Sequence, residues 1–140
     1  MHKSRLTITI LLLTSLFIIL AQSCDTKKVK IHNLRCEYMH NPIGIDAVSP
    51  RFTWNYEVIS GHDFKQGSVQ LLLSRNKEAL SEKTSNDIWR SGVISTNEMF
   101  ITPDSSCVLE PHTTYYWQVI VWDNNKKQKI VSPVSHFETA

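Results

Sequence analysis

Residues 114–123 form the most regular stretch of the chain, because large side chains alternate along it as TYYWQVIVWD. Successive side chains of a β-strand point to opposite faces of a sheet. One face of this strand therefore carries Tyr115, Trp117, Val119 and Val121, and the other carries Tyr116, Gln118, Ile120 and Trp122. We expect the first set to face a hydrophobic core.

Turn-forming residues recur at short intervals after residue 30, and no long stretch repeats apolar residues every three or four positions. This pattern predicts an all-β fold, with one short helical turn in residues 76–83. Phe52, Trp54 and Tyr56 share a face, so Trp54 and Trp117 are expected at the aromatic centre of a two-sheet sandwich. About seven strands are predicted, in residues 31–38, 51–58, 68–74, 88–93, 98–102, 114–123 and 130–138.

The segment that leads into residues 114–123 reads LEPHTTY from Leu109 to Tyr115. It resembles the Leu-x-Pro-x-Thr-x-Tyr pattern of fibronectin type III domains. In such a tyrosine corner the Tyr hydroxyl bonds to the backbone a few residues upstream. The resemblance implies a fibronectin III/immunoglobulin-like sandwich and a structural role for Tyr115.

The N-terminus reads as an export signal, with basic Lys3 and Arg5, an apolar run over residues 6–21, and small residues before Cys24. The run is too short and too interrupted for a permanent transmembrane helix. Residues 21–24 (AQSC) resemble a bacterial lipobox. We expect a lipoprotein signal peptide at 1–23, lipidation of Cys24, a tether at 24–30 and a domain at 31–140. The alternative is an ordinary signal peptide with Cys24 free or disulfide-bonded.

Lys3 and Arg5 account for the whole net charge of +2, so the mature chain is neutral and its net charge favours neither a nucleic-acid partner nor an anionic surface. The basic residues Lys126, Lys127 and Lys129 are expected in a solvated turn, with a binding patch as the alternative. Cys36 and Cys107 are expected to be buried free thiols, with a disulfide as the alternative. The scattered histidines and cysteines predict neither a metal site nor a cofactor.

Several short motifs, taken in order, resemble the N-terminal fibronectin-like domain of bacterial α-L-rhamnosidases. The chain departs from that family at residues 130–132, where a Trp is usual, and in residues 66–73, which lack an Ala-Tyr step. The resemblance begins near Asn33 and runs to the end of the chain. Its motifs are NLRCEY (33–38), NPIGID (41–46), PRFTW (50–54), DIWRSG (87–92), YYW (115–117), VWD (121–123) and FETA (137–140).

The resemblance implies that rhamnoside hydrolysis in that family takes place in a helical barrel downstream of this domain. We therefore expect no catalytic residues in this chain. A glycosidase needs two carboxylates that flank one bond. The acids nearest to aromatic residues, Asp46, Asp87 and Asp123, each have a structural explanation in a turn or at a strand end.

Trp89, Tyr116 and Trp122 could share an outer face of the sandwich, where they would form a docking surface or stack on sugar rings. Our first hypothesis is a lipid-anchored, exported accessory module that contacts downstream glycosidase domains or another cell-envelope protein. In this hypothesis a break in the reading frame explains the abrupt end of the chain. The second hypothesis is a stand-alone carbohydrate-binding lipoprotein, which predicts a continuous exposed aromatic strip including Trp122. The third is the N-terminal part of an active α-L-rhamnosidase.

Overall fold

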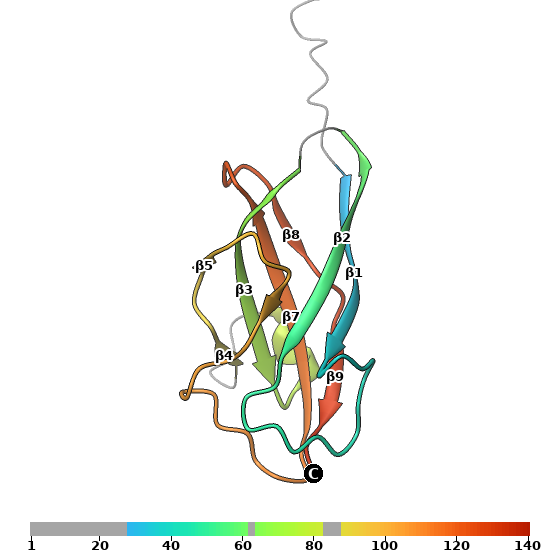
Figure 1. Cartoon of the computed structure of the whole chain (residues 1–140), viewed down its shortest axis with the longest axis vertical. Coiled ribbons are helices and arrows are strands. Elements are labelled where there is room, and N and C mark those ends of the chain that lie inside the picture. Colours follow the sequence, from blue (N-terminus) through green and yellow to red (C-terminus); the bar gives the residue numbers. More distant parts are fainter. Residues whose placement is uncertain (1–27, 62–63, 83–87) are drawn as a thin grey trace, which may run out of the picture.

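The computed structural model describes residues 28–61, 64–82 and 88–140. Those residues form two antiparallel β-sheets packed face to face (Figure 1). The predicted all-β sandwich is therefore confirmed. The signal peptide, Cys24 and Asp87 lie outside the described residues.

The smaller sheet has the strand order β1-β2-β6. Its main contact is between β1 (Lys28–Cys36) and β2 (Phe52–Ser60), which run antiparallel from the Lys28–Ser60 pair to the Cys36–Phe52 pair. The short strand β6 (Phe100–Ile101) pairs with the beginning of β2.

The larger sheet is built on β3 (Gln66–Ser74) and β7 (Thr114–Asp123), which pair along nearly their whole length. On one side, β3 also pairs with β4 (Ile88–Arg90) and β5 (Ile94–Ser95). On the other side, β7 pairs with β8 (Lys129–Val131) and β9 (Ser135–Glu138). The short helix α2 (Lys77–Glu82) follows β3, within the predicted helical turn.

Strand boundaries differ from the prediction where the backbone turns. The first strand begins at Lys28, inside the expected tether, and ends at Cys36 because Glu37 and Tyr38 have positive φ angles of 48° and 65°. The strand expected over 130–138 is two strands, since Pro133 interrupts it and cannot donate a ladder hydrogen bond. Likewise β4 ends before Gly92, whose φ of 71° turns the chain toward β5.

Aromatic side chains fill the space between the sheets. Trp54 and Trp117, expected at the centre, are 1% and 0% exposed. Phe52 joins the two layers, with its ring centroid 4.8 Å from that of Trp117 and 5.5 Å from that of Phe137. Tilted rings at such distances stabilise a core beyond their burial alone.

A buried glutamine satisfies the indole of the core tryptophan. Gln66 accepts a hydrogen bond from Trp54 Nε1 at 3.1 Å. Its amide donates to the carbonyl oxygens of Thr96 and Glu98 at 3.2 and 2.7 Å. One side chain of β3 thus bonds to β2 in the opposite sheet and to the connection between β5 and β6.

The two ends of the sandwich carry different segments (Figure 1). The start of β1 lies at the end that also carries the β2–β3 connection and the β7–β8 turn. The C-terminus lies at the opposite end, which we call the base. Among residues 28–61, 64–82 and 88–140, no helix has both the length and the apolar character needed to cross a bilayer.

Replacing Gln66 with Leu should lower the free energy of unfolding by about 1–3 kcal/mol, because a buried indole N–H and two carbonyls lose their partner. Urea denaturation measures the change. Gln70→Leu, on a half-buried position of the same strand, is the control and should shift stability by less than ~0.5 kcal/mol. Equal effects of the two substitutions would contradict the role given to Gln66.

Candidate functional site

Three segments meet at the base of the sandwich: residues 37–51, residues 102–113 and the end of the chain. The backbone N–H of Ile45 donates to Glu138 O, and that of Ala140 donates to Ile45 O, both at 3.0 Å. From the other side, His112 N donates to Ala140 O at 3.1 Å. The last residues therefore lie hydrogen-bonded between the two connections.

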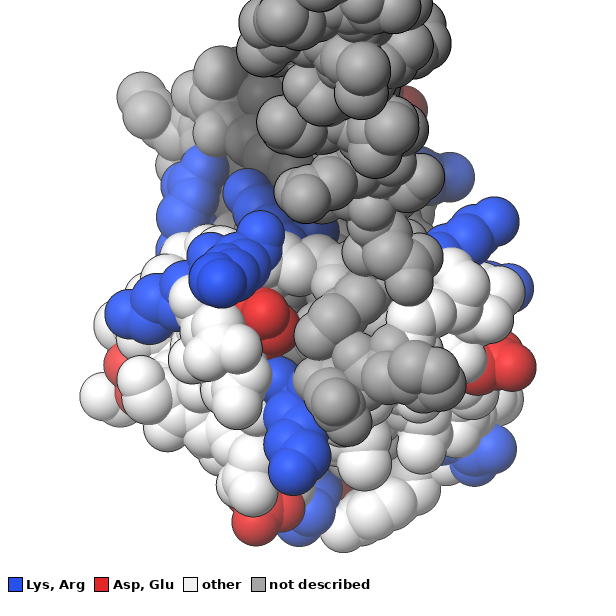
Figure 2. Space-filling model, turned by 90° about the horizontal axis from the view of Figure 1, so that it is seen from above, with Lys and Arg blue, Asp and Glu red and all other residues white. Residues whose placement is uncertain are grey.

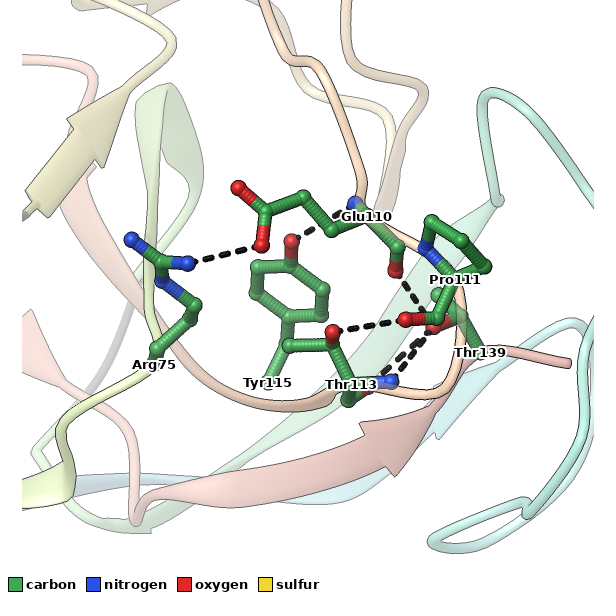
Figure 3. A network of polar contacts seen from close by, with 6 residues as sticks. All are labelled: Arg75, Glu110, Pro111, Thr113, Tyr115 and Thr139. Carbon is green, nitrogen blue, oxygen red and sulfur yellow. Dashed lines mark hydrogen bonds and ion pairs between the residues drawn. The ribbon is translucent and has the colours of Figure 1, made fainter.

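A tyrosine corner anchors the second of these connections to β7 (Figure 3). The Tyr115 hydroxyl accepts a hydrogen bond from Glu110 N at 2.9 Å. The Thr113 hydroxyl donates to Pro111 O at 2.9 Å, and the Thr139 hydroxyl donates to Glu110 O at 2.7 Å. Tyr115 thus takes the structural position expected from the sequence, and Thr139 joins the same network from the C-terminal segment.

An ion pair lies at the edge of this network. Arg75, which follows β3, bonds to Glu110 Oε2 at 2.8 Å (Figure 3). Both side chains are about three-fifths exposed, at 62% and 60%. An exposed pair of this kind adds little to stability, on the order of 0–1 kcal/mol.

A groove of about 520 Å³ opens at the base, between residues 45–49 and 104–111. Thr139 and Ala140 line it too. Its rim carries two of the most exposed apolar side chains among the described residues, Val48 at 87% and Val108 at 80%. The groove thus combines apolar surface with the point where the chain ends.

Three acidic side chains line this groove: Asp46, Asp104 and Glu110. Hydrogen bonds from the side chain and the backbone N–H of Ser106 lower the pKa of Asp104. A general acid needs the opposite shift, a raised pKa. Within the described part of the chain, no three or more His, Cys, Asp or Glu side chains are grouped to hold a metal ion.

Cys36 and Cys107 are both free and buried. Burial raises the pKa of the Cys36 thiol to about 12, with a smaller contribution from Glu37. Burial also raises the pKa of Cys107 to about 11, together with the charge of Asp104. Since the thiolate is the nucleophile and the metal ligand, both cysteines behave as small core residues.

The expectation that Trp89 shares an outer face with Tyr116 and Trp122 is wrong. In β4, Trp89 pairs with Leu73, a core residue of β3, and packs against the same core. Its indole N–H donates to Ser106 Oγ at 3.0 Å. Trp89 therefore helps to fix the 104–110 segment that borders the groove.

Helix α2 covers the middle of the outer face of the larger sheet. Its Ala79 and Leu80 bury Ile120, and Tyr116 and Trp122 pack at the edges of this small cluster. The two aromatic residues are half-buried and lie roughly 20 Å apart along the strand. They do not form the continuous exposed aromatic strip that a sugar-binding platform on this face would need.

Of the other aspartates singled out in the sequence, Asp123 is the last residue of β7 and Asp46 lies in a connection between strands. Asp123 is buried and accepts a hydrogen bond from Gln128 N at 3.0 Å, which closes the β7–β8 turn. Lys126, with a φ of 55°, lies in this turn, as expected. Asp46 is exposed in the connection between β1 and β2.

Sequence reasoning missed the groove itself, because its residues come from three distant segments without regular spacing. It also missed a stack of Arg51 on exposed aromatic rings. The Arg51 guanidinium carbon lies 3.9 Å from the centroid of Phe100 and 5.8 Å from that of Tyr38. A positive φ at Tyr38 presents that ring, and no sequence periodicity signals such a turn.

Comparison with known proteins places this architecture in a family. A family profile described as the Rha78A-like, N-terminal immunoglobulin domain matches residues 31–140. A solved structure of an α-L-rhamnosidase from Dictyoglumus thermophilum is 29% identical and superposes with a TM-score of 0.72 over 83% of this chain, which is 13% of that structure's chain.

Curated relatives extend the similarity in sequence. An α-L-rhamnosidase of Streptomyces avermitilis is 30% identical over 103 residues, and one of Formosa agariphila is 26% identical over 141 residues. These matches cover 74% and 99% of this chain but only 10% and 15% of the relatives. The chain thus spans a small part of the length of the curated relatives that it matches.

Tyr115→Phe should lower the free energy of unfolding by about 1 kcal/mol, because the substitution removes the hydroxyl that accepts from Glu110 N and nothing else. The neighbouring Tyr116→Phe is a matched control and should change stability by less than ~0.5 kcal/mol. Urea denaturation of both variants measures the difference. The tyrosine corner would lose its assigned role if the two variants were equally stable.

At pH 8 the buried thiols of a mature chain carrying Cys24→Ser should react slowly with Ellman's reagent, and quickly once urea is added. With pKa values of about 12 and about 11, the thiolate is at most on the order of one part in a thousand at pH 8. The folded pKa values exceed the ordinary value of 9.0, so the folded state holds these thiol protons more firmly than the unfolded state does. The stability that depends on keeping the two thiols protonated is therefore complete below pH 9 and is lost as the pH rises toward 11–12. Rapid reaction of the folded chain would contradict the burial.

Proposed function

The chain belongs to the family of Rha78A-like N-terminal immunoglobulin domains, and we propose that it serves as a non-catalytic accessory module of an α-L-rhamnosidase-like, carbohydrate-degrading system. The module is exported and anchored to a bacterial membrane through a lipid on Cys24. Its base docks against the protein segment that follows residue 140.

The observation that carries the proposal is the position of Ala140. Its backbone is hydrogen-bonded on both sides, to Ile45 and to His112. A polypeptide that continues from this point starts on the groove, beside exposed Val48 and Val108. Apolar surface at a chain junction is typical of contacts between consecutive domains.

The non-catalytic role is supported by an acidic side chain at the base of the sandwich. The lowered pKa of Asp104 suits a fixed turn and opposes a role as general acid. The parts that match this chain cover only 10–15% of the relatives that carry the name α-L-rhamnosidase. Rhamnoside hydrolysis is accordingly assigned to the remaining part of such proteins and not to this domain.

The lipid anchor is supported by the sequence AQSC at residues 21–24 and by the basic and apolar segment before it. Several acyl chains, each stabilised by ~0.8 kcal/mol per buried methylene, would hold the module on a membrane. Docking at the base is compatible with this anchor, since the base lies at the end opposite to the start of β1 (Figure 1).

The docking proposal predicts slower amide hydrogen exchange at the base in the native gene product than in an isolated chain. The two samples are the protein extracted from its own membranes and residues 24–140 with Cys24→Ser. Peptides covering 45–49 and 107–111 should exchange at least about tenfold more slowly in the native product, because docking excludes water from both connections. Peptides around Val93, which is 58% exposed on another surface, should exchange equally in both samples.

Two valine substitutions, one at the base and one elsewhere, form a test and its matched control. Val48→Asp in the native product should restore fast exchange at 107–111, whereas Val93→Asp should leave it slow. The docking proposal is overturned if both samples exchange equally at the base, or if Val93→Asp has the same effect as Val48→Asp.

A further inference from the structure

Lysines gather at the end of the sandwich opposite to the base, although the mature chain is neutral. Figure 2 looks onto this end and shows Lys and Arg side chains around its rim, with fewer Asp and Glu side chains among them. These lysines come from the start of β1, the last residue of the β2–β3 connection and the β7–β8 turn with the start of β8. The six lysines of this surface, which we call the lysine end, are exposed: Lys28, Lys30, Lys65, Lys126, Lys127 and Lys129.

Backbone contacts hold these segments together. Asn124 N donates to Lys65 O at 2.9 Å, so the last residue of the β2–β3 connection lies against the β7–β8 turn. Strands β1 and β8 are also neighbours across the sandwich. The segments that carry the lysines thus lie next to one another at this end of the sandwich.

Few acidic groups compensate this charge among the described residues. Glu57 lies opposite Lys30 in the β1–β2 pairing, and the carboxylate of Asp123 is buried in the turn. None of the six lysines forms an ion pair with a described residue. Among the described residues, Trp122 has its aromatic ring beside one of these lysines, with Lys129 Nζ 5.7 Å from the ring centroid.

Exposed apolar side chains lie at the same end of the sandwich as these lysines. Val58 and Ile59, near the end of β2, are 38% and 50% exposed. The pairing of Lys28 with Ser60 and of Val29 with Val58 places them beside the first residues of β1. Lysines around a small apolar surface are the composition that binds the interface of an anionic bilayer.

The short segment between Cys24 and β1 limits how far the lysine end can lie from a lipid anchor on Cys24. Only residues 25–27 separate Cys24 from Lys28, the first residue of β1. Four residue steps span at most about 14 Å even when fully extended. If Cys24 carries the anchor, as the proposed function holds, the lysine end stays within about one to two Debye lengths of the lipid headgroups.

We propose that the lysine end is a membrane-contact surface that binds anionic phospholipid headgroups and holds the sandwich upright on the bilayer. This inference rests on the proposed lipid anchor for its geometry, but the headgroup affinity belongs to the folded domain alone. A lysine near an anionic surface contributes about 1 kcal/mol, so the contact reinforces the acyl anchor and is weak without it. The base then points away from the membrane, toward the docked segment.

Vesicle sedimentation tests the headgroup affinity separately from the anchor. The sample is residues 24–140 with Cys24→Ser, which carries no lipid. It should bind vesicles of phosphatidylglycerol and phosphatidylcholine at low salt, lose binding at 0.5 M NaCl, and fail to bind vesicles of phosphatidylcholine alone. Lys126→Gln together with Lys127→Gln should lower the partition coefficient by about 30-fold, as expected for the loss of two charges.

A charge-matched pair at other positions is the control. Lys77→Gln with Arg90→Gln removes the same charge from the start of α2 and from β4, and binding should stay within threefold of the parent chain. Equal losses for the two pairs, or salt-independent binding to neutral vesicles, would overturn the inference. Binding to soluble dextran sulfate without binding to anionic vesicles would also overturn it and would indicate an anionic polysaccharide as the partner. The proposed docking can fail in hydrogen exchange without altering any of these results.

Discussion

The contact between the sheets depends on Phe52, which packs against Trp117 and Phe137 in the opposite layer. Phe52 is the first residue of β2, and Phe137 lies in β9, so this cluster also fixes the chain near its end. Tyr115 stacks on Phe137 at 5.5 Å while its hydroxyl accepts from Glu110 N. The geometry of the base therefore follows from how the aromatic core is packed.

The two ends of the sandwich suit different contacts. At the base, Val48 and Val108 surround the point where Ala140 is fixed, and an apolar docking contact is proposed there. At the opposite end, exposed lysines surround the start of β1, where a contact with lipid headgroups is proposed. Residues 24–140 carry no net charge, and a domain with lysines at one end and apolar surface at the other is well arranged to connect a membrane with a second domain.

Local patterns predicted the parts of the fold that depend on regular backbone. The alternation in residues 114–123 gave the bounds of β7 correctly, and the core positions of Trp54 and Trp117 followed from the same periodicity. The motif from Leu109 to Tyr115 located the tyrosine corner, because its hydrogen bond spans only five residues.

Features that depend on tertiary contacts could not be predicted from local sequence patterns. Trp89 was placed on the wrong face because β4 is three residues long, too short to show alternation. The partial burial of Tyr116 and Trp122 depends on where α2 packs. The groove depends on a parallel bridge between Ile45 and Thr139, which are 94 residues apart in sequence. Nothing in a single strand signals such contacts.

The intact mass of the protein extracted from its native membranes is the sharpest test of the proposed anchored, docked module. We expect a chain that begins at an acylated Cys24 and has a mass several times the 16.1 kDa of these 140 residues, because matching relatives extend far beyond this domain. A chain without acyl groups, or a mass no larger than that of residues 24–140 with its lipid, would contradict an anchored module that docks on a following domain.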